Sequence, residues 1–235
     1  ISRKQRRLLQ SVRRIYWDVC ADEAAADQRE RELIRTLHPR FNTVGVRPAA
    51  PRFLVWRAEH EAVRNGVILM DMSFMAKFRV EGRDAGRLLN WISANHVDGA
   101  SGQITYTQWL NDRGTIEADL TVTKLNDDRF MVVATDTAHR HVETWMRRHV
   151  EGRHVHIGDV TGAWAQLNVQ GPRSRELLGL VTDADLSNAA FPYRTSRPID
   201  IGFALVICTR ITYLGELGYE LYIPTEQAAH VYDRL

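Results

Sequence analysis

The chain has 235 residues, enough for one large domain or two small ones, and its 44% hydrophobic and 26% charged content is that of a globular protein. Its net charge of +2 is too small for a dedicated nucleic-acid binder, and no apolar run approaches the length of a membrane span. We therefore expect neither nucleic acid nor a membrane among its partners. Cys20 and Cys208 make no disulfide framework, so we expect a reducing compartment: the cytoplasm, or the mitochondrial matrix in a eukaryote.

The first 50 residues differ in composition from the rest. Residues 1–15 contain six basic residues and no acid, with apolar residues at helical spacing, which predicts a basic amphipathic helix. Such a helix is also typical of a mitochondrial transit peptide, but acids follow from Asp18 onward and favour a solvated helix or the remainder of another domain. A second helix is predicted over 21–37, and two prolines mark 47–51 as a linker. We thus predict a helical segment over 1–50 and a folded domain over 51–235.

Downstream of residue 56, helices and strands mix without a regular βαβ alternation. Helices are predicted over 58–65, 84–92, 137–149, 173–180 and 227–235, and strands over 68–80, 129–134, 155–157, 164–169, 199–212 and 219–223. Helix 84–92 should bury Ala85, Leu88, Leu89 and Ile92, and helix 137–149 should bury Val142, Trp145 and Met146. Helix 173–180 should be capped in its first turn by Pro172 and Ser174. The pattern predicts an α+β fold with largely antiparallel sheets.

The most informative segment is 106–122, which predicts a β-hairpin. Asn111 and Gly114 supply a polar turn between two runs of alternating apolar residues. Glu117 and Asp119 follow the turn two residues apart, so their side chains share one face of the second strand. If that face points inward, a carboxylate there indicates a functional site; if it points outward, the two acids are simply the solvated side of the strand.

Other catalytic and metal-binding patterns are missing from the sequence. It has no GxGxxG after a strand, and no P-loop, nucleophile elbow or CxxC motif. His139 and His141, and likewise His154 and His156, have metal-ligand spacing but no third ligand follows, so surface or structural histidines are favoured.

A series of short tags, in order from about residue 56 to the last residue, resembles one family. They are 59–64 (EHEAVR), 70–73 (MDMS), 80–85 (VEGRDA), 94–97 (ANHV), the hairpin, 159–161 (DVT), 169–172 (VQGP) and 210–220 (RITYLGELGYE). Together they resemble the aminomethyltransferase (glycine-cleavage T-protein) family, and most closely the form in the C-terminal half of dimethylglycine and sarcosine dehydrogenases. That branch carries an aliphatic residue at Leu214, where the wider family has Thr.

The resemblance implies a fold and a function. The fold is a folate-binding aminomethyltransferase type, with α/β subdomains, one of them ferredoxin-like, around a central folate cavity. We expect the family's C-terminal β-barrel to be absent and residues 1–50 to have no counterpart in the family. The implied function is tetrahydrofolate-dependent one-carbon transfer in dimethylglycine, sarcosine or glycine catabolism, with an amine donor from a flavin- or lipoyl-dependent protein. The alternatives are a non-catalytic folate-binding regulatory or assembly protein and an inactive fragment of a larger flavin-dependent dehydrogenase.

The resemblance also assigns two carboxylates. Asp119 matches the family's catalytic aspartate, and a fixed carboxylate can stabilise a cationic iminium and move a proton at the pterin nitrogen. Glu117 is secondary, because the family accepts Asp or Glu there. Glu216, in a glycine-flanked turn, can accept two parallel hydrogen bonds from the pterin's amino group and ring N–H. The alternative for Glu216 is an exposed acid on a turn.

Four further residues are assigned to the folate. Tyr106 should line the pterin pocket, unless it is an ordinary buried strand tyrosine. Thr135 replaces an asparagine common in the T-protein, which changes that pterin contact. Arg210 should hold the carboxylate of the folate tail or else pair with Glu220, and Tyr219 is a further cofactor-binding candidate.

Overall fold

The computed structural model describes residues 60–235 and, before them, residues 21, 22, 25, 28, 29, 32, 33 and 36. The chain divides into two compact units, Ile1–Ala58 and Glu59–Leu235. In the first unit the described residues from 25 to 36 are helical, as predicted for 21–37. The helix predicted over 1–15 and the linker over 47–51 lie outside the described residues. Among the residues described, no helix is long and apolar enough to cross a membrane.

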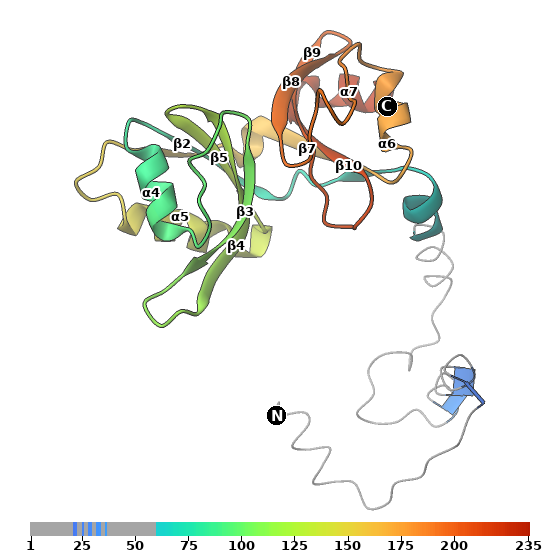
Figure 1. The fold of residues 1–235 in the computed structure, drawn as a ribbon, viewed down its shortest axis with the longest axis horizontal. Coiled ribbons are helices and arrows are strands. Elements are labelled where there is room, and N and C mark those ends of the chain that lie inside the picture. The colour runs from blue at the N-terminus through green and yellow to red at the C-terminus, as the bar shows by residue number, and fades with distance from the viewer. Residues whose placement is uncertain (1–20, 23–24, 26–27, 30–31, 34–35, 37–59) are drawn as a thin grey trace, which may run out of the picture. The chain divides into compact units, whose positions relative to one another are not determined.

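The second unit contains two five-stranded sheets in which every strand pair is antiparallel, as predicted. Sheet A has the order β1-β7-β10-β9-β8 and sheet B the order β3-β4-β5-β2-β6 (Figure 1). The strands of sheet A are β1 (Ile68–Asp71), β7 (Trp164–Gln170), β8 (Ser196–Ile201), β9 (Ala204–Thr209) and β10 (Gly218–Pro224). Those of sheet B are β2 (Ala76–Glu81), β3 (Ile104–Leu110), β4 (Ile116–Asn126), β5 (Arg129–Ala134) and β6 (His156–Asp159).

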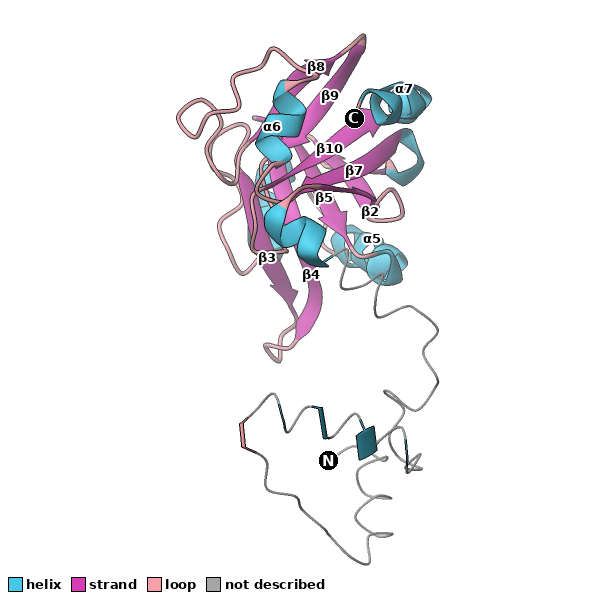
Figure 2. Cartoon of the chain, turned by 90° about the vertical axis from the view of Figure 1, so that its right-hand side faces the viewer, coloured by secondary structure: helices cyan, strands magenta, loops and turns pink. Residues whose placement is uncertain are grey.

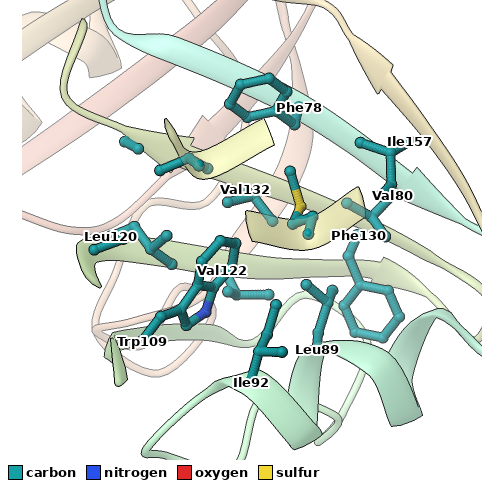
Figure 3. Close-up of a cluster of buried hydrophobic side chains, with 14 of the residues drawn as sticks. Phe78, Val80, Leu89, Ile92, Trp109, Leu120, Val122, Phe130, Val132 and Ile157 are labelled. Carbon is teal, nitrogen blue, oxygen red and sulfur yellow. The ribbon is translucent and has the colours of Figure 1, made fainter. Parts of the chain in front are cut away.

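Helices α4 (Ala85–Ile92) and α5 (His139–Arg148) cover one face of sheet B. All four apolar residues predicted for the buried stripe of α4 are buried, and they pack against Trp109, Leu120 and Val122 of the β3–β4 hairpin (Figure 3). In α5, Val142 and Met146 are buried and Trp145 is partly buried. These buried side chains between the two helices and sheet B form a first hydrophobic cluster. The packing in this cluster, rather than the hairpin turn alone, fixes the register of β4.

Helices α6 (Ser174–Gly179) and α7 (Ala228–Arg234) accompany sheet A, and both contact β10 (Figure 2). A second cluster of buried side chains, which includes Val169, Val206 and Leu221, lies on this face of the sheet. The other faces of the two sheets share a small third cluster that joins Met131 and Val133 of sheet B to Tyr222 of sheet A. We call the two faces that share this third cluster the inner faces.

Two segments that were each predicted as one strand contain two strands in the structure. The segment 68–80 holds β1 in sheet A and β2 in sheet B, because the chain crosses between the sheets over 72–75. The prediction of a single strand over 199–212 is also wrong, because β8 and β9 form a hairpin that turns at Gly202, with φ of 60°. An apolar run continues across that turn from Ile201 to Ile207, so only the glycine marks it.

The predicted cap of helix 173–180 is also wrong. The N-cap of α6 is Arg173, and no side chain caps the helix. Ser174 is buried instead, and its hydroxyl donates to the carbonyl of Leu217 at 3.3 Å. Ser174 therefore ties α6 to the loop before β10.

Candidate functional site

The predicted hairpin is present as β3 and β4. The turn closes by hydrogen bonds from Asn111 N to Thr115 O (3.0 Å) and from Gly114 N to Asn111 O (2.8 Å), with Gly114 at a φ of 72°. Strand β5 pairs with β4 only from Leu120 onward, so residues 116–119 of β4 pair with β3 alone. Asp119 thus lies in the part of β4 that extends beyond β5. Figure 1 shows the long β3–β4 hairpin.

Asp119 is exposed and is held by its cross-strand neighbours. It pairs with Gln108 in the β3–β4 register, and Gln108 Nε2 donates to Asp119 Oδ1 at 3.4 Å. The hydrogen bond from the Tyr106 phenol to the Asp119 carboxylate raises the pKa of Tyr106. Asp119 is therefore a carboxylate with two neighbouring donors and an open approach, and burial does not distinguish it from a solvated strand acid.

The prediction that Glu117 and Asp119 share one face of the strand is wrong. The β3–β4 register shifts between Trp109 and Leu110, and Glu117 contacts α5, which covers the face opposite to Asp119. Glu117 Oε1 accepts from Asn111 Nδ2 at 2.7 Å and its Oε2 from His141 Nε2 at 2.8 Å. The hydrogen bond from Asn111 and, after it, the one from His141 lower the pKa of Glu117. Both oxygens are engaged by the protein, so Glu117 fastens the turn to α5.

Tyr106 and Thr135 lie on the inner side near Asp119. The Tyr106 side chain is 49% exposed, so the alternative of a buried strand tyrosine is wrong. Thr135 follows β5 directly, and extending the β4–β5 register by one residue places it opposite Asp119. Its hydroxyl contacts Asp136 Oδ1 and Thr137 Oγ1, each at 3.2 Å.

Glu216 lies beside sheet A, in the loop that precedes β10. Its Oε1 forms an ion pair with Arg64 Nη1 at 2.5 Å, with the Glu216 side chain 22% exposed and that of Arg64 51% exposed. Arg64 belongs to the helix over residues 60–65. The alternative of a solvated acid on a turn therefore does not describe Glu216, which is mostly buried and paired.

Arg210 and Tyr219 are not brought together with the other candidates. Arg210 Nη1 donates to the carbonyl of Phe191 at 2.6 Å, while Glu220 accepts from Tyr222 and Asn168 instead. Tyr219 alternates with Glu220 along β10, so it points away from the inner face into the second cluster, where its ring packs on Phe191. A side chain in that core cannot reach a ligand at the inner face.

Sequence reasoning missed two ionisable groups on the inner faces, one fully buried and one partly buried. Lys77, on β2, is fully buried, and its Nζ donates to the carbonyls of Ser73 (3.0 Å) and Met75 (2.8 Å). Burial lowers the pKa of Lys77 to about 8, against the opposing effect of Asp71, Glu220 and Asp159. Burial also raises the pKa of Glu220, on β10.

The sequence does contain a signal for this polar lining. Gln166, Asn168 and Gln170 alternate along β7, and all three are buried. Polar residues with a period of two in an otherwise apolar central strand indicate an interior that is not purely hydrophobic. Gln166 Oε1 and Gln170 Oε1 lack a hydrogen-bond partner in the described part of the chain.

Comparisons with known proteins confirm the resemblance. A family model described as the GCVT N-terminal domain matches residues 37–235, so residues 37–50, for which we expected no counterpart, lie within the match. The 4-methylaminobutanoate oxidase (formaldehyde-forming) of Paenarthrobacter nicotinovorans is 38% identical over 177 residues, which are 75% of this chain and 22% of the oxidase. The aminomethyltransferase of Staphylococcus carnosus is 29% identical over 180 residues, 76% of this chain and 49% of that protein. The chain thus spans about half or less of these relatives.

Solved structures confirm the fold class. The glycine cleavage system aminomethyltransferase T of Bartonella henselae superposes with a TM-score of 0.65 at 26% identity, over 75% of this chain and 47% of that one. The heterotetrameric sarcosine oxidase of Corynebacterium sp. U-96, in complex with pyrrole 2-carboxylate, gives a TM-score of 0.58 at 16% identity, over 80% of this chain and 92% of that one. The second likeness concerns the fold alone.

Proposed function

The chain belongs to the GCVT N-terminal domain family, and from this premise we propose that it transfers a one-carbon unit to tetrahydrofolate. The observation that carries the proposal is the open Asp119 carboxylate, which is held by Gln108 and Tyr106 on the inner side of sheet B. The sequence resemblance assigns the catalytic aspartate to this same position.

Transfer of a one-carbon unit through a cationic iminium requires a fixed negative charge near that cation. When bound, tetrahydrofolate would supply the nucleophilic nitrogen that takes up the one-carbon unit, and the donor amine would leave as its bond to that unit breaks. Asp119 would stabilise the cationic iminium of the incoming unit and accept the proton that the attacking nitrogen loses. Gln108 and Tyr106 both donate to this carboxylate, which orients it while it stays exposed to a ligand.

The residues present suit a reduced pterin. Tyr106 offers a half-exposed aromatic face for stacking, and Glu216 offers a carboxylate acceptor for the amino group. Gln170 Oε1 is a buried acceptor without a partner among the described residues, and it lies against Gly218, two residues beyond Glu216. A ligand that brings N–H donors supplies what these acceptors need.

The donor we propose is an N-methylated amine. The relative from Paenarthrobacter nicotinovorans is named for the oxidation of such an amine with release of formaldehyde, and it is 38% identical over the aligned region. In our proposal a flavin-dependent partner or domain oxidises an amine of the dimethylglycine or sarcosine type, and this chain captures the one-carbon unit. The second donor class is a lipoyl-bound aminomethyl group, which the likeness to aminomethyltransferases supports.

The test replaces Asp119 with Ala while a sarcosine-oxidising flavoenzyme supplies the one-carbon unit. Formation of methylene-tetrahydrofolate above the protein-free rate should fall by about 10²- to 10⁴-fold, because a positioned carboxylate is lost. Tetrahydrofolate affinity should stay unchanged. Glu117→Gln is the matched control, since the carboxylate two residues away is already engaged by Asn111 and His141. Transfer by the Asp119→Ala variant at the wild-type rate would contradict the assignment, and wild-type binding without transfer would favour a non-catalytic folate-binding protein.

A further inference from the structure

Three segments that are far apart in the sequence meet beside Glu216. The helix over 60–65 ends at Gly66, whose carbonyl accepts from Arg173 N at 3.0 Å. Gly171, with φ of 126°, lies so close that a Cβ there would be 2.4 Å from the carbonyl oxygen of Gly66. Gly171 N in turn donates to the carbonyl of Leu217 at 2.8 Å. Three of the tags found in the sequence, 59–64, 169–172 and 210–220, thus form one structural junction.

The backbone of the loop before β10 is anchored without the side chain of Glu216. Leu217 accepts from Gly171 N and from the Ser174 hydroxyl, and Leu214 N donates to Thr212 Oγ1 at 3.1 Å. Tyr213 adds a contact of its hydroxyl with Met70 Sδ at 3.9 Å. These backbone contacts do not determine the orientation of the Glu216 carboxylate. Among the described ion pairs, the partner of that carboxylate is Arg64.

We propose that Arg64 is a positioning residue, which holds the Glu216 carboxylate aimed at a ligand with two adjacent N–H donors, such as an amino-substituted pyrimidine ring. This inference rests on the proposed function and adds a residue to it. Arg64 Nη1 engages Oε1 of Glu216, which leaves Oε2 and the second lone pair of Oε1 as acceptors. The junction at Gly66 and Gly171 gives the helix a fixed place, so the guanidinium starts from a defined backbone position.

The half-exposed guanidinium of Arg64 is better suited to orienting the Glu216 carboxylate than to stabilising the fold. An ion pair with a half-exposed partner adds little to stability, because solvent screens it. The ion pair still orients the Glu216 carboxylate despite this screening, because a charge-assisted hydrogen bond has a preferred geometry. Loss of Arg64 should therefore alter binding more than folding.

The experiment titrates the whole chain with tetrahydrofolate under reducing conditions and follows the fluorescence of its six tryptophans. Arg64→Ala should weaken affinity about tenfold, as expected for the loss of a hydrogen bond to a charged group, with an unchanged midpoint of thermal unfolding. Arg64→Lys should restore part of the affinity. Arg129→Ala is the matched control, because Arg129 pairs with Glu81 at 3.1 Å with similar exposures of 48% and 28%.

A double-mutant cycle separates positioning from a general effect of charge. If Arg64 acts through Glu216, the Arg64→Ala change should have little further effect in the Glu216→Gln background. Additive losses would overturn the inference, and so would wild-type or tighter affinity in the Arg64→Ala variant. In those cases the wild type still binds, so the proposed function stands. No binding by the wild type would overturn both.

Discussion

Three carboxylates in the second unit differ by what surrounds them rather than by residue type. Both oxygens of Glu117 are engaged by the protein, Glu216 is paired with Arg64, and Asp119 is open to solvent with Gln108 and Tyr106 beside it. A transferred one-carbon unit needs a charge that is fixed but accessible. Asp119 alone of the three meets both conditions.

Lys77 carries a prediction about pH. Its pKa falls from 10.5 to about 8 on folding, so between these values the unfolded chain binds more protons than the folded one. The free energy of unfolding should therefore rise with pH from about 8 to 10.5 in the wild type, and a pKa difference of one corresponds to about 1.4 kcal/mol. Urea unfolding across this range, compared with Lys77→Met, isolates the effect. The variant should lack that rise; parallel pH profiles would contradict the shift.

At this scale the sequence alone predicts little of the site. The assignments of Asp119 and Glu216 come from the family resemblance. The spacing predicted only that Glu117 and Asp119 share a face, and the register shift in β4 overturns that prediction. Arg64 is within a recognised tag, but nothing local links it to Glu216, 152 positions later. Such a pairing depends on the tertiary junction at Gly66 and Gly171, which no local pattern encodes.

The helices and strands with a strong hydrophobic periodicity and clear turn or helix-ending residues at their ends were predictable. Helix α4 and strand β5 have the predicted bounds to within one residue, and the β3–β4 hairpin turns at the predicted Asn111–Gly114. The two split strands were missed because only short turn signals mark the breaks: Asp71 and Ser73, which form a turn hydrogen bond at 2.9 Å, and Gly202. The long overhang of β4 beyond β5 depends on a tertiary pairing, and this overhang is what exposes Asp119.

The junction of helix 60–65 with the turn at Gly171 gives a prediction for an element. Gly171→Ala adds a Cβ at φ of 126° and 2.4 Å from a backbone oxygen, so we expect a loss of more than about 2 kcal/mol in unfolding free energy. Binding of tetrahydrofolate should weaken too, since Arg64 moves with its helix.

The matched control for this change is Gly114→Ala. Gly114 also has a positive φ, 72°, but no atom lies within 4 Å of the added Cβ. The backbone conformation alone should cost about 1 kcal/mol. Equal losses in the two variants, measured by chemical unfolding, would show that the close approach at Gly66 has no energetic importance.

At the scale of the second unit, the two sheets carry different parts of the proposed site. Sheet B contributes Asp119 and Tyr106, and the segment before β10 in sheet A contributes Glu216. The inner faces combine a small apolar cluster around Tyr222 with the buried polar row of β7. A mixed apolar and polar lining of this kind would suit the ligand that we propose, a reduced pterin, which is part aromatic and part hydrogen-bonding.

The chain spans 49% of the length of the aminomethyltransferase of Staphylococcus carnosus and 22% of the amine oxidase it resembles. Folate binding by these residues is therefore the first requirement of the proposed transfer. Titration of the wild-type chain with tetrahydrofolate, followed by tryptophan fluorescence, tests this central requirement most directly. We predict a saturable change that Glu216→Gln weakens and Asp119→Ala preserves. A signal that does not saturate, or that is the same in wild type and Glu216→Gln, would contradict it.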